Sequence, residues 1–456
     1  MRFTPWANRL ALTLSLSATA ALTACGGGGD DGGKAHVRLL NLTQSVAELD
    51  LEVDNTTISS KIANGTAGSY ADATTDSVTT RVLNSSTGSG ISANTLSLTK
   101  NDHYTLVAYS YGGDADGNNV LYRTSLLQEE TEAPDANKAK LLIMNLAPDA
   151  GNLDTYVTTA ASCAASTDSA LSSNLAGITG SGYLQLNSGT FRICVTGYGK
   201  RSDLRLEIPA VELASKSINT LYLTGTSSGT MVNGTTLVQQ GAVTKTASKL
   251  ARVRVINALP TGTYASASVQ GDATLLPNGT SPNIGEYKVY AAGASNLALT
   301  TGGSAAAAGA ALDTTTTLPT LTAGVDYTVL ISGPASTPLA SVFVDDNRLP
   351  TSTSSTKIRL VNGMSTAAAT SSLFVEYTAK ATSIAAGSAS KTSEFTPLAS
   401  GNTVQVTSPL STAADRVLYN PGNPLTGVTS LSANGVYTIF VMGDPTAVTG
   451  TLIRDR

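Results

Sequence analysis

Apolar and polar residues alternate along much of this chain with the period of two that is typical of β-strands. In residues 49–54, Leu-Asp-Leu-Glu-Val-Asp, three apolar side chains would lie on one face of a strand and three acidic ones on the other. Residues 327–332 and 437–442 are almost uniformly apolar or β-branched, as expected of buried strands. Gly, Asn, Asp and Pro interrupt these runs, and only residues 303–312 suggest a short helical turn. The pattern predicts an all-β protein.

A short pattern occurs four times, about 105 residues apart. It consists of a basic residue, an apolar residue, any residue, two apolar residues and an asparagine, and it ends at Asn41, Asn145, Asn257 and Asn362. A unit of this size with about seven short strands fits an immunoglobulin-like sandwich. We therefore predict four tandem immunoglobulin-like antiparallel β-sandwich domains after a lipoprotein signal peptide, at residues 34–133, 138–247, 249–350 and 356–456.

A second pattern, a Leu six residues before Tyr-Thr, occurs late in three units, at Tyr104, Tyr327 and Tyr437. The second unit keeps the spacing but has Asn219 instead of tyrosine. This pattern is typical of a tyrosine corner, in which the hydroxyl ties a turn between two sheets; contact with a ligand is the alternative. The polar linkers at 132–138, 244–249 and 350–356 are short, and we expect separate domains on a semi-flexible string.

The N-terminus has the pattern of a secretory leader. Arg2 and Arg9 flank an uncharged, apolar stretch at 10–24 that is too short to span a bilayer. Leu-Thr-Ala-Cys at 22–25 resembles a bacterial lipobox, which implies lipidation of Cys25 and removal of residues 1–24. The alternative is an ordinary signal peptide that leaves Cys25 free. Gly26 follows the cysteine, and by resemblance to sorted lipoproteins of Gram-negative bacteria this favours the outer membrane.

Residues 25–33 are rich in Gly and Asp, and we expect a flexible tether because nothing in them can be buried. The predicted location is therefore lipid-anchored at the outer membrane, on its surface or periplasmic face. The chain has 13% charged residues and a formal net charge of −4, which becomes −6 without Arg2 and Arg9. This composition gives no indication of a nucleic-acid partner.

Cys163 and Cys194 are the cysteines that remain after lipidation, and export makes a disulfide between them the expected state. Phe191, Ile193 and Val195 would share one face of a strand, so Cys194 would point to the other face. The predicted bridge therefore fixes a long loop to the outside of a sheet, away from the sandwich core.

The opening strand that ends in asparagine, the turn at 145–154 and Leu-Thr-Ala-Gly-Val-Asp-Tyr-Thr-Val at 321–329 together resemble a bacterial extracellular family called domain of unknown function 4397. The resemblance covers four copies, although the fourth lacks the Pro-Asp turn and the second has Asn219. It implies a secreted, lipid-anchored or wall-anchored protein. The family has no assigned catalytic residues, so none is carried over.

Catalytic chemistry has little support. The two histidines, His36 and His103, are too few for a zinc site or a Ser-His-Asp triad in each unit, and we expect no metal or cofactor. His36 occupies the basic position of the repeated pattern, which we interpret as a surface position. Gly-Thr-Ser-Ser-Gly at 225–229 matches a nucleophile elbow by letter, but a strand pattern comes after it where a helix is needed. This favours a hairpin turn over catalysis by Ser227.

Two acidic segments are candidate calcium sites. Asp114, Asp116 and Asn118 alternate as calcium ligands would, but the glycine comes one position early and no glutamate closes the loop. This favours an acidic hairpin turn. Residues 344–348, Val-Asp-Asp-Asn-Arg, lie at a boundary between units, where calcium binding is again the alternative to a plain linker.

Tyr109, Tyr111 and Tyr122 form the best candidate ligand surface. Tyr109 and Tyr111 are two residues apart and would share one face of a strand, with Tyr122 in the neighbouring strand of a hairpin. An exposed aromatic platform of this kind would suit a sugar, whereas half-buried tyrosines are ordinary in sandwiches. The only tryptophan, Trp6, lies in the leader, which argues against a glycan site.

These observations predict a lipid-anchored cell-envelope protein with a non-catalytic structural, adhesive or surface-binding role. Its expected partners are the membrane, through the N-terminal lipid, and a protein or glycan at the cell surface. The alternative is a glycan- or polymer-binding protein that assists uptake. An enzyme is not expected.

Overall fold

The computed structural model describes residues 33–113, 119–226, 230–293, 296–304, 307–312, 320–366, 369–410, 413–423, 425–444 and 447–456. The predicted all-β fold of sandwiches is confirmed. The strands form eight sheets that pair into four sandwiches, called units one to four in chain order. None of the helical segments in these ranges has the length and hydropathy needed to cross a membrane.

The described residues of units one and two contain seventeen strands and one short 3₁₀ turn. Unit one has β1 (Lys34–Leu42), β2 (Glu48–Val53), β3 (Thr56–Ala63), β4 (Ala71–Thr74), β5 (Asp76–Asn84), β6 (Gly90–Leu98), β7 (His103–Tyr111) and β8 (Leu121–Gln128). Unit two has β9 (Lys138–Asn145), η1 (Pro148–Ala150), β10 (Leu153–Thr158), β11 (Ser172–Leu175), β12 (Thr179–Asn187), β13 (Gly189–Gly197), β14 (Lys200–Leu213), β15 (Ile218–Gly225), β16 (Val232–Val238) and β17 (Val243–Thr246).

Units three and four have the same plan. Unit three has β18 (Leu250–Asn257), β19 (Tyr264–Val269), β20 (Asp272–Thr280), β21 (Asn283–Ile284), β22 (Lys288–Ala291), β23 (Leu297–Ser304), β24 (Ala307–Ala311), β25 (Asp326–Ser332) and β26 (Leu339–Asp345). Unit four has β27 (Thr356–Met364), β28 (Thr370–Val375), β29 (Thr378–Ala385), β30 (Ser388–Ala389), β31 (Ser393–Phe395), β32 (Val404–Leu410), β33 (Ala413–Tyr419), β34 (Val436–Asp444) and β35 (Ala447–Arg454).

Each unit has one parallel pair of strands within otherwise antiparallel sheets. The opening strand lies inside its sheet and runs parallel to a late strand, in the pairs β1–β7, β9–β15, β18–β25 and β27–β34. Both strands of such a pair are covered on two sides, which explains the largely apolar sequences of late strands such as β25 and β34. One face of the sheet contributes to the core of its own sandwich, and the other packs against the neighbouring unit.

The strand predicted at 49–54 has the expected orientation. Leu49, Leu51 and Val53 of β2 are buried in the core of unit one, while Asp50 and Glu52 are partly exposed. The alternating pattern therefore identified both the strand and its buried face.

The repeated asparagine connects the two sheets of each sandwich. Asn257, at the end of β18, donates from Nδ2 to the carbonyls of Thr263 at 3.0 Å and Gly279 at 2.9 Å, and Gly279 belongs to the opposite sheet. Its Oδ1 accepts from the backbone of Leu259. The same contacts recur, and all four side chains are fully buried, at Asn41, Asn145, Asn257 and Asn362.

The predicted tyrosine corners are confirmed in three units. The hydroxyl oxygen of Tyr327 accepts a hydrogen bond from the backbone N–H of Thr322 at 3.0 Å. The two equivalent bonds measure 3.0 Å and 2.9 Å and involve Tyr104 with Thr99 and Tyr437 with Ser432. In unit two, Asn219 donates to the side chain of Ser217 instead.

The predicted disulfide between Cys163 and Cys194 is also confirmed. Ile193 and Val195 belong to the core of unit two, whereas Cys194 lies in a separate small cluster with Tyr156 and Cys163. The bridge therefore holds the loop between β10 and β11 against the outer face of the sheet, as the strand pattern indicated.

The prediction of separate domains on a semi-flexible string is wrong, because sheet faces of neighbouring units pack directly together. Units one and two share an apolar layer formed by Leu40, Leu42, Val107, Tyr109, Leu146, Tyr222 and Leu237. Units three and four share a second layer formed by Ile256, Ala258, Leu330, Val361, Phe440 and Met442. In the second layer the backbones come close, because a Cβ on Gly363 would lie 2.6 Å from the Cβ of Ala258.

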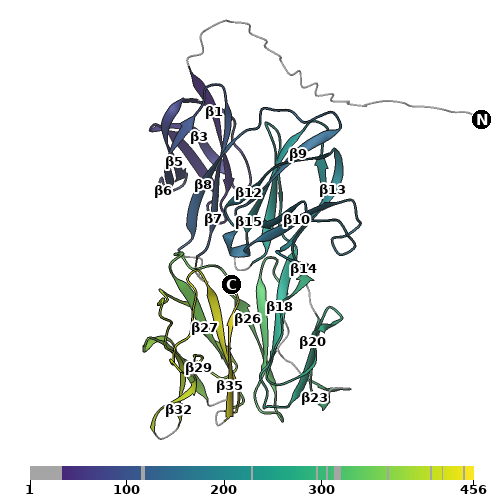
Figure 1. Cartoon of the computed structure of the whole chain (residues 1–456), viewed down its shortest axis with the longest axis vertical. Helices are drawn as coiled ribbons and strands as arrows, with labels where there is room; N and C mark the ends of the chain where they lie inside the picture. Colours follow the sequence, from purple (N-terminus) through teal and green to yellow (C-terminus); the bar gives the residue numbers. More distant parts are fainter. Residues whose placement is uncertain are drawn as a thin grey trace, which may run out of the picture.

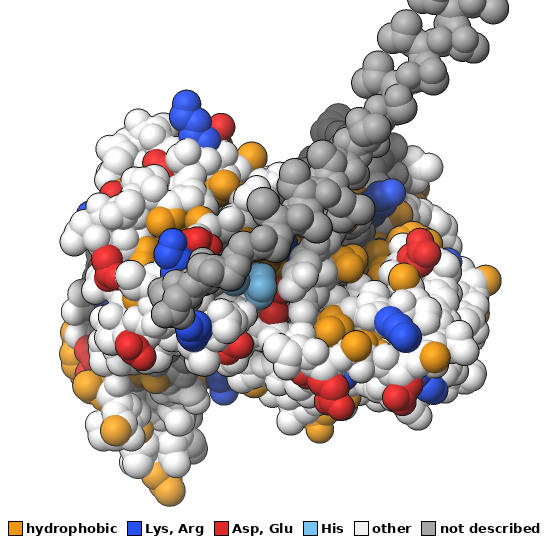
Figure 2. Space-filling view, turned by 90° about the horizontal axis from the view of Figure 1, so that it is seen from above, with side chains coloured by type: hydrophobic (Ala, Val, Ile, Leu, Met, Phe, Trp, Pro, Cys, Tyr) orange, Lys and Arg blue, Asp and Glu red, His pale blue; other side chains and the backbone are white. Residues whose placement is uncertain are grey.

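The two pairs of units are stacked end to end. Figure 1 shows units one and two side by side at the top, units four and three side by side beneath them, and the C-terminus near the centre. Hydrogen bonds connect the upper pair of units to the lower pair. For example, Thr226 Oγ1 in unit two donates to the carbonyl of Gly324 in unit three at 2.8 Å. From above, charged side chains are scattered over a mainly uncharged polar surface rather than gathered in one patch (Figure 2).

Replacing the repeated asparagine should destabilise the protein strongly. Asn257→Ala removes three hydrogen bonds made by a fully buried side chain, so we expect a loss of about 2–4 kcal/mol in unfolding free energy. Chemical denaturation measures this, with Asn296→Ala, at an exposed position, as the control that should change by less than about 0.5 kcal/mol. Equal stability of the two variants would contradict the role of the amide.

Removing the disulfide should also lower stability, since it closes a loop between cysteines 31 residues apart. The Cys163→Ala and Cys194→Ala double variant should lose about 3–4 kcal/mol on the chain-entropy model. The unfolding midpoint of the wild type should fall on reduction, and that of the variant should not respond. A wild-type midpoint unaffected by reductant would rule out a stabilising bridge.

Candidate functional site

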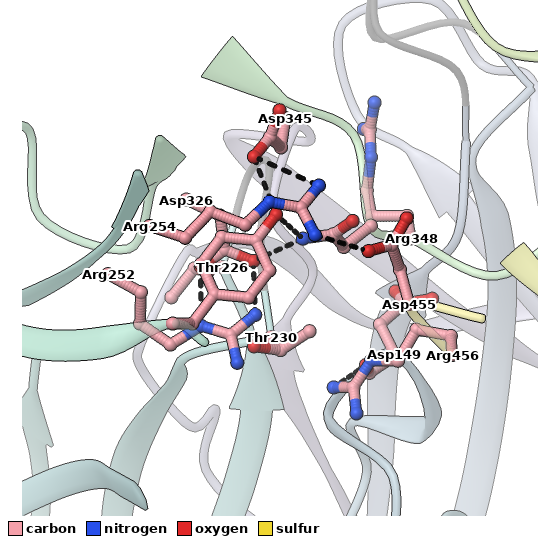
Figure 3. Close-up of polar contacts among 12 residues, drawn as sticks. Asp149, Thr226, Thr230, Arg252, Arg254, Asp326, Asp345, Arg348, Asp455 and Arg456 are labelled. Carbon is pink, nitrogen blue, oxygen red and sulfur yellow. Dashed lines mark hydrogen bonds and ion pairs between the residues drawn. The ribbon is translucent and has the colours of Figure 1, made fainter. Parts of the chain in front are cut away.

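The strongest candidate site is the place where units two, three and four meet. A cleft of about 960 Å³ lies between the β13–β14 hairpin, β18, residues 284–289 and the end of β35. We call it the junction cleft. Several arginines of the repeated pattern, with their acidic partners, form its wall and the surrounding polar layer, and Figure 3 shows these side chains converging.

The basic residue that opens the repeated pattern is buried in unit three. Arg252 Nε lies 2.8 Å from Asp326 Oδ1, and Nη2 lies 2.5 Å from Oδ2, which makes a two-pronged ion pair. Asn347 donates to the same carboxylate at 2.8 Å. Lys357 of unit four is buried as well, whereas His36 is partly exposed. The interpretation of this position as a surface position is therefore wrong for units three and four, because another unit covers it.

The third position of the pattern carries an arginine in three units, and this arginine makes the same network each time. Arg254 Nε donates to Thr328 Oγ1 at 2.8 Å, and Thr328 donates to Asp345. The threonine is the one that comes directly after the corner tyrosine, and the acid lies at or just after the end of the last strand of the unit. The other two networks are Arg38–Thr105–Glu129 and Arg359–Thr438–Asp455.

Units three and four exchange these arginines across their interface. Arg254 Nη1 lies 2.7 Å from Asp455 Oδ1 of unit four, and Arg359 Nη1 lies 2.8 Å from Asp345 Oδ1 of unit three. The ring of Tyr287 lies against Arg254, whose guanidinium carbon is 4.4 Å from the ring centroid. The interface is thus fixed by two reciprocal ion pairs in addition to its apolar layer.

At Asp326 and Asp203, pairing with arginines lowers the carboxyl pKa by more than burial raises it. Burial alone would raise the pKa of Asp326, but the charge and hydrogen bonds of Arg252 and a hydrogen bond from Asn347 hold that pKa below its usual range. The pKa of Asp203 is also lowered, because Arg205 and Arg252 more than offset its burial. Both carboxylates are therefore ionised at neutral pH.

Asp149, in the 3₁₀ turn of unit two, connects all four units. Its Oδ2 accepts from the backbone of Gly112 in unit one, and its Oδ1 accepts from Leu349 just before unit four, both at 2.8 Å. Arg456 Nη2 donates to its carbonyl at 2.5 Å. Burial raises the pKa of Asp149 in spite of these hydrogen bonds.

The carboxylates of the acidic segment at 344–348 pair with basic side chains of the protein. Asp345 pairs with Arg359, and Asp346 accepts from Arg348 Nε at 2.9 Å and lies 3.4 Å from Lys357 Nζ. These contacts favour the structural interpretation of the segment over calcium. Within the ranges that the structure describes, no group of three or more His, Cys, Asp or Glu residues could hold a metal ion.

The tyrosines predicted as a ligand surface do not form an exposed platform. Tyr109 is 2% exposed and lies in the apolar layer between units one and two, where Tyr111 packs beside it. Tyr122 is partly buried against the core of unit one. The shared face of Tyr109 and Tyr111 was predicted correctly, but that face is turned toward unit two rather than toward solvent.

The two histidines lie together on unit one. Their rings are 4.6 Å apart, and His36 Nδ1 is 3.0 Å from Asp72 Oδ1. Four other predicted positions, Cys25, Asp114, Asp116 and Asn118, lie outside the described residues, as does Ser227.

Sequence reasoning missed the arginine networks. A signal was present, because Arg38, Arg254 and Arg359 occupy the same position of the repeated pattern. Each unit with this arginine also has the Thr of Tyr-Thr and an acid where its last strand ends. Unit two has Leu142 at the arginine position and lacks the corner tyrosine, so the two departures occur together.

The comparisons with known proteins agree with the repeat. The family model "Domain of unknown function (DUF4397)" matches residues 35–156 and 251–371, and the chain belongs to this family. Each match begins at the opening strand of unit one or three and extends into the next unit. No curated protein sequence matches the chain.

Among solved structures, the chain is similar to a Bacteroides uniformis protein provisionally assigned to cell adhesion. The identity is 12% and the TM-score is 0.21, over 46% of this chain and 99% of that one. A family 26 carbohydrate-binding module from Eubacterium rectale, solved with maltoheptaose, shares 11% identity with a TM-score of 0.15, over 46% of this chain and 97% of that one. At such scores these likenesses say nothing about what this chain binds.

The Arg252–Asp326 pair should make stability depend on pH. Because folding lowers the pKa of Asp326, its contribution is complete above about pH 5 and is lost as the pH falls below about 4. Asp326→Asn removes the two-pronged counter-charge of the buried Arg252 and leaves the more distant Asp203, at 4.0 Å, so we expect a loss of about 3–5 kcal/mol at pH 7. Denaturation between pH 3 and pH 7 should show the difference from wild type narrowing toward low pH.

The matched control is Asp76→Asn, at an exposed position in unit one, which should change the unfolding free energy by less than about 0.5 kcal/mol. A constant difference between Asp326→Asn and wild type over this pH range would contradict the assignment.

Proposed function

We propose that this chain is a lipid-anchored cell-envelope protein with a non-catalytic structural, adhesive or surface-binding role. The observation that carries the proposal is that the four sandwiches pack against one another. An apolar layer joins units one and two, and a second layer with reciprocal buried ion pairs joins units three and four. Hydrogen bonds of Asp149 and Thr226 connect the two pairs. Units packed in this way can project a surface in a defined orientation.

The proposed anchor is Cys25, joined to unit one by the Gly- and Asp-rich tether up to residue 33. Nine residues extend to at most about 32 Å. The first strand, β1, starts at the top of unit one, and units three and four lie at the opposite end (Figure 1). An anchored molecule would therefore hold units three and four farthest from the membrane, where a partner on another surface could reach them.

The alternative is a glycan- or polymer-binding protein that assists uptake. Burial of Tyr109 removes the platform that the sequence suggested for this role. The observation that favours this alternative is Tyr198, which is 56% exposed and lies at the junction cleft. An exposed aromatic ring beside charged hydrogen-bonding groups is suited to a sugar.

Protease treatment of intact cells tests the location, with Cys25→Ser as the variant that cannot be lipidated. We expect the wild type to fractionate with the outer membrane and Cys25→Ser to be released in soluble form. Loss of the wild type from intact cells would support an adhesive role at the surface, and survival until the outer membrane is breached would support a structural role on the periplasmic face. Soluble wild-type protein would overturn lipid anchoring.

A further inference from the structure

The junction cleft has more cationic side chains than its acids neutralise. Seven Lys and Arg residues and four Asp and Glu residues line it, in a chain with 28 Lys and Arg and a formal net charge of −4. Two more acids lie outside the lining, Asp326 beside Arg252 and Asp345 beside Arg254, and counting both still leaves an excess of positive charge. The cleft is therefore cationic in an otherwise acidic protein.

The arginines of the cleft fall into two kinds. Burial alone would lower the pKa of Arg252, but Asp326 raises it above its usual value, so this cation is well neutralised. Arg205 and Arg456 differ, because burial and repulsion between the cations lower their pKa values, to about 9 for Arg456. The protein itself does not neutralise these two cations fully.

Their hydrogen bonds are incomplete as well. Arg205 is 4% exposed, and it donates to the carbonyl of Thr230 at 2.8 Å and to Asp203 at 2.6 Å, but its Nε has no partner. The Nε of Arg456 is also buried without a partner, although the residue as a whole is partly exposed. Buried donors are usually matched. Arg254 and Arg359 also each have one unmatched buried nitrogen, but both lie in the reciprocal ion pairs between units three and four.

Glycine at position 197 leaves room for the Asp203–Arg205 pair beside the cleft. A Cβ on Gly197 would lie 2.5 Å from Asp203 Oδ2 and 3.3 Å from Arg205 Nη2, so a larger residue would displace this pair. The volume of about 960 Å³ is at the upper end of the usual range for small-molecule sites. It can therefore accommodate a charged group together with a body of about the size of a sugar.

We propose that the junction cleft binds a small ligand through an oxyanion group, a carboxylate, sulfate or phosphate, recognised by Arg205 and Arg456. Planar guanidinium groups donate to such oxygens in matched pairs, and an anion would supply both the missing charge and the missing acceptors. Tyr198 lines the cleft with an exposed aromatic side chain, which is suited to contact the uncharged part of the ligand. This proposal goes beyond the envelope role, because it does not depend on anchoring or location.

Isothermal titration calorimetry of the purified full chain at pH 7 tests the proposal. The probes are phosphate, sulfate and glucuronate, each compared with chloride at equal ionic strength. We expect saturable binding of at least one probe and a loss of affinity of about tenfold or more in Arg456→Gln. Tighter binding of glucuronate than of phosphate would indicate a carboxylated sugar as the source of the anion, and the reverse order would indicate a phosphorylated ligand.

Arg123→Gln is the matched control, since this arginine lies on unit one, away from the cleft, and it should bind as the wild type does. Absence of binding to all three probes, or equal affinity of Arg456→Gln and wild type, would overturn the proposal. If Arg456→Gln does not fold, the same titration is made with Lys200→Gln, at an exposed position of the cleft. Weaker binding by that variant supports the site, and unchanged binding overturns it.

Discussion

The architecture depends on the amide side chain of the repeated asparagine, which supplies hydrogen bonds to backbone groups inside each sandwich. A strand that leaves its sheet exposes carbonyl and N–H groups, which are costly to bury unpaired. The repeated asparagine satisfies two carbonyls and one N–H at this point, and it thereby joins the two sheets where the chain crosses between them. Aspartate could not replace it, because an ionised carboxylate has no donor.

A second constraint acts on the other face of the same strand. The corner tyrosine faces the core of its own unit, while the next residue, a threonine, faces outward and accepts from the repeated arginine. One dipeptide therefore fixes the fold of a sandwich and the chemistry of its contact with a neighbour. In units three and four the arginines cross the interface, so the acid that completes each network also holds the partner unit.

Local pattern in the sequence predicts the strands and their faces, but it does not predict the contacts between units. The strands, the corners at Tyr104, Tyr327 and Tyr437, and the outward direction of Cys194 could all be obtained from spacing and alternation. Tyr109 was placed on the right face but given the wrong environment, because alternation shows that a face is apolar and not which element covers it.

The candidate site was harder still to predict. Its residues come from positions such as Asp203, Arg252 and Asp455, which lie far apart in sequence and meet only when three units are assembled. Low overall charge also concealed it, since a few buried arginines hardly change the composition of a chain with 13% charged residues.

The shared layer between paired units has a consequence for how such chains can grow. Each sandwich presents one sheet face, such as that of Leu40, Val107 and Tyr109 in unit one, that is covered only by its neighbour. An odd number of copies would leave one such face in water, where it would favour aggregation. Duplication of a single copy is therefore disfavoured, and family members built on this plan should gain or lose their copies in twos.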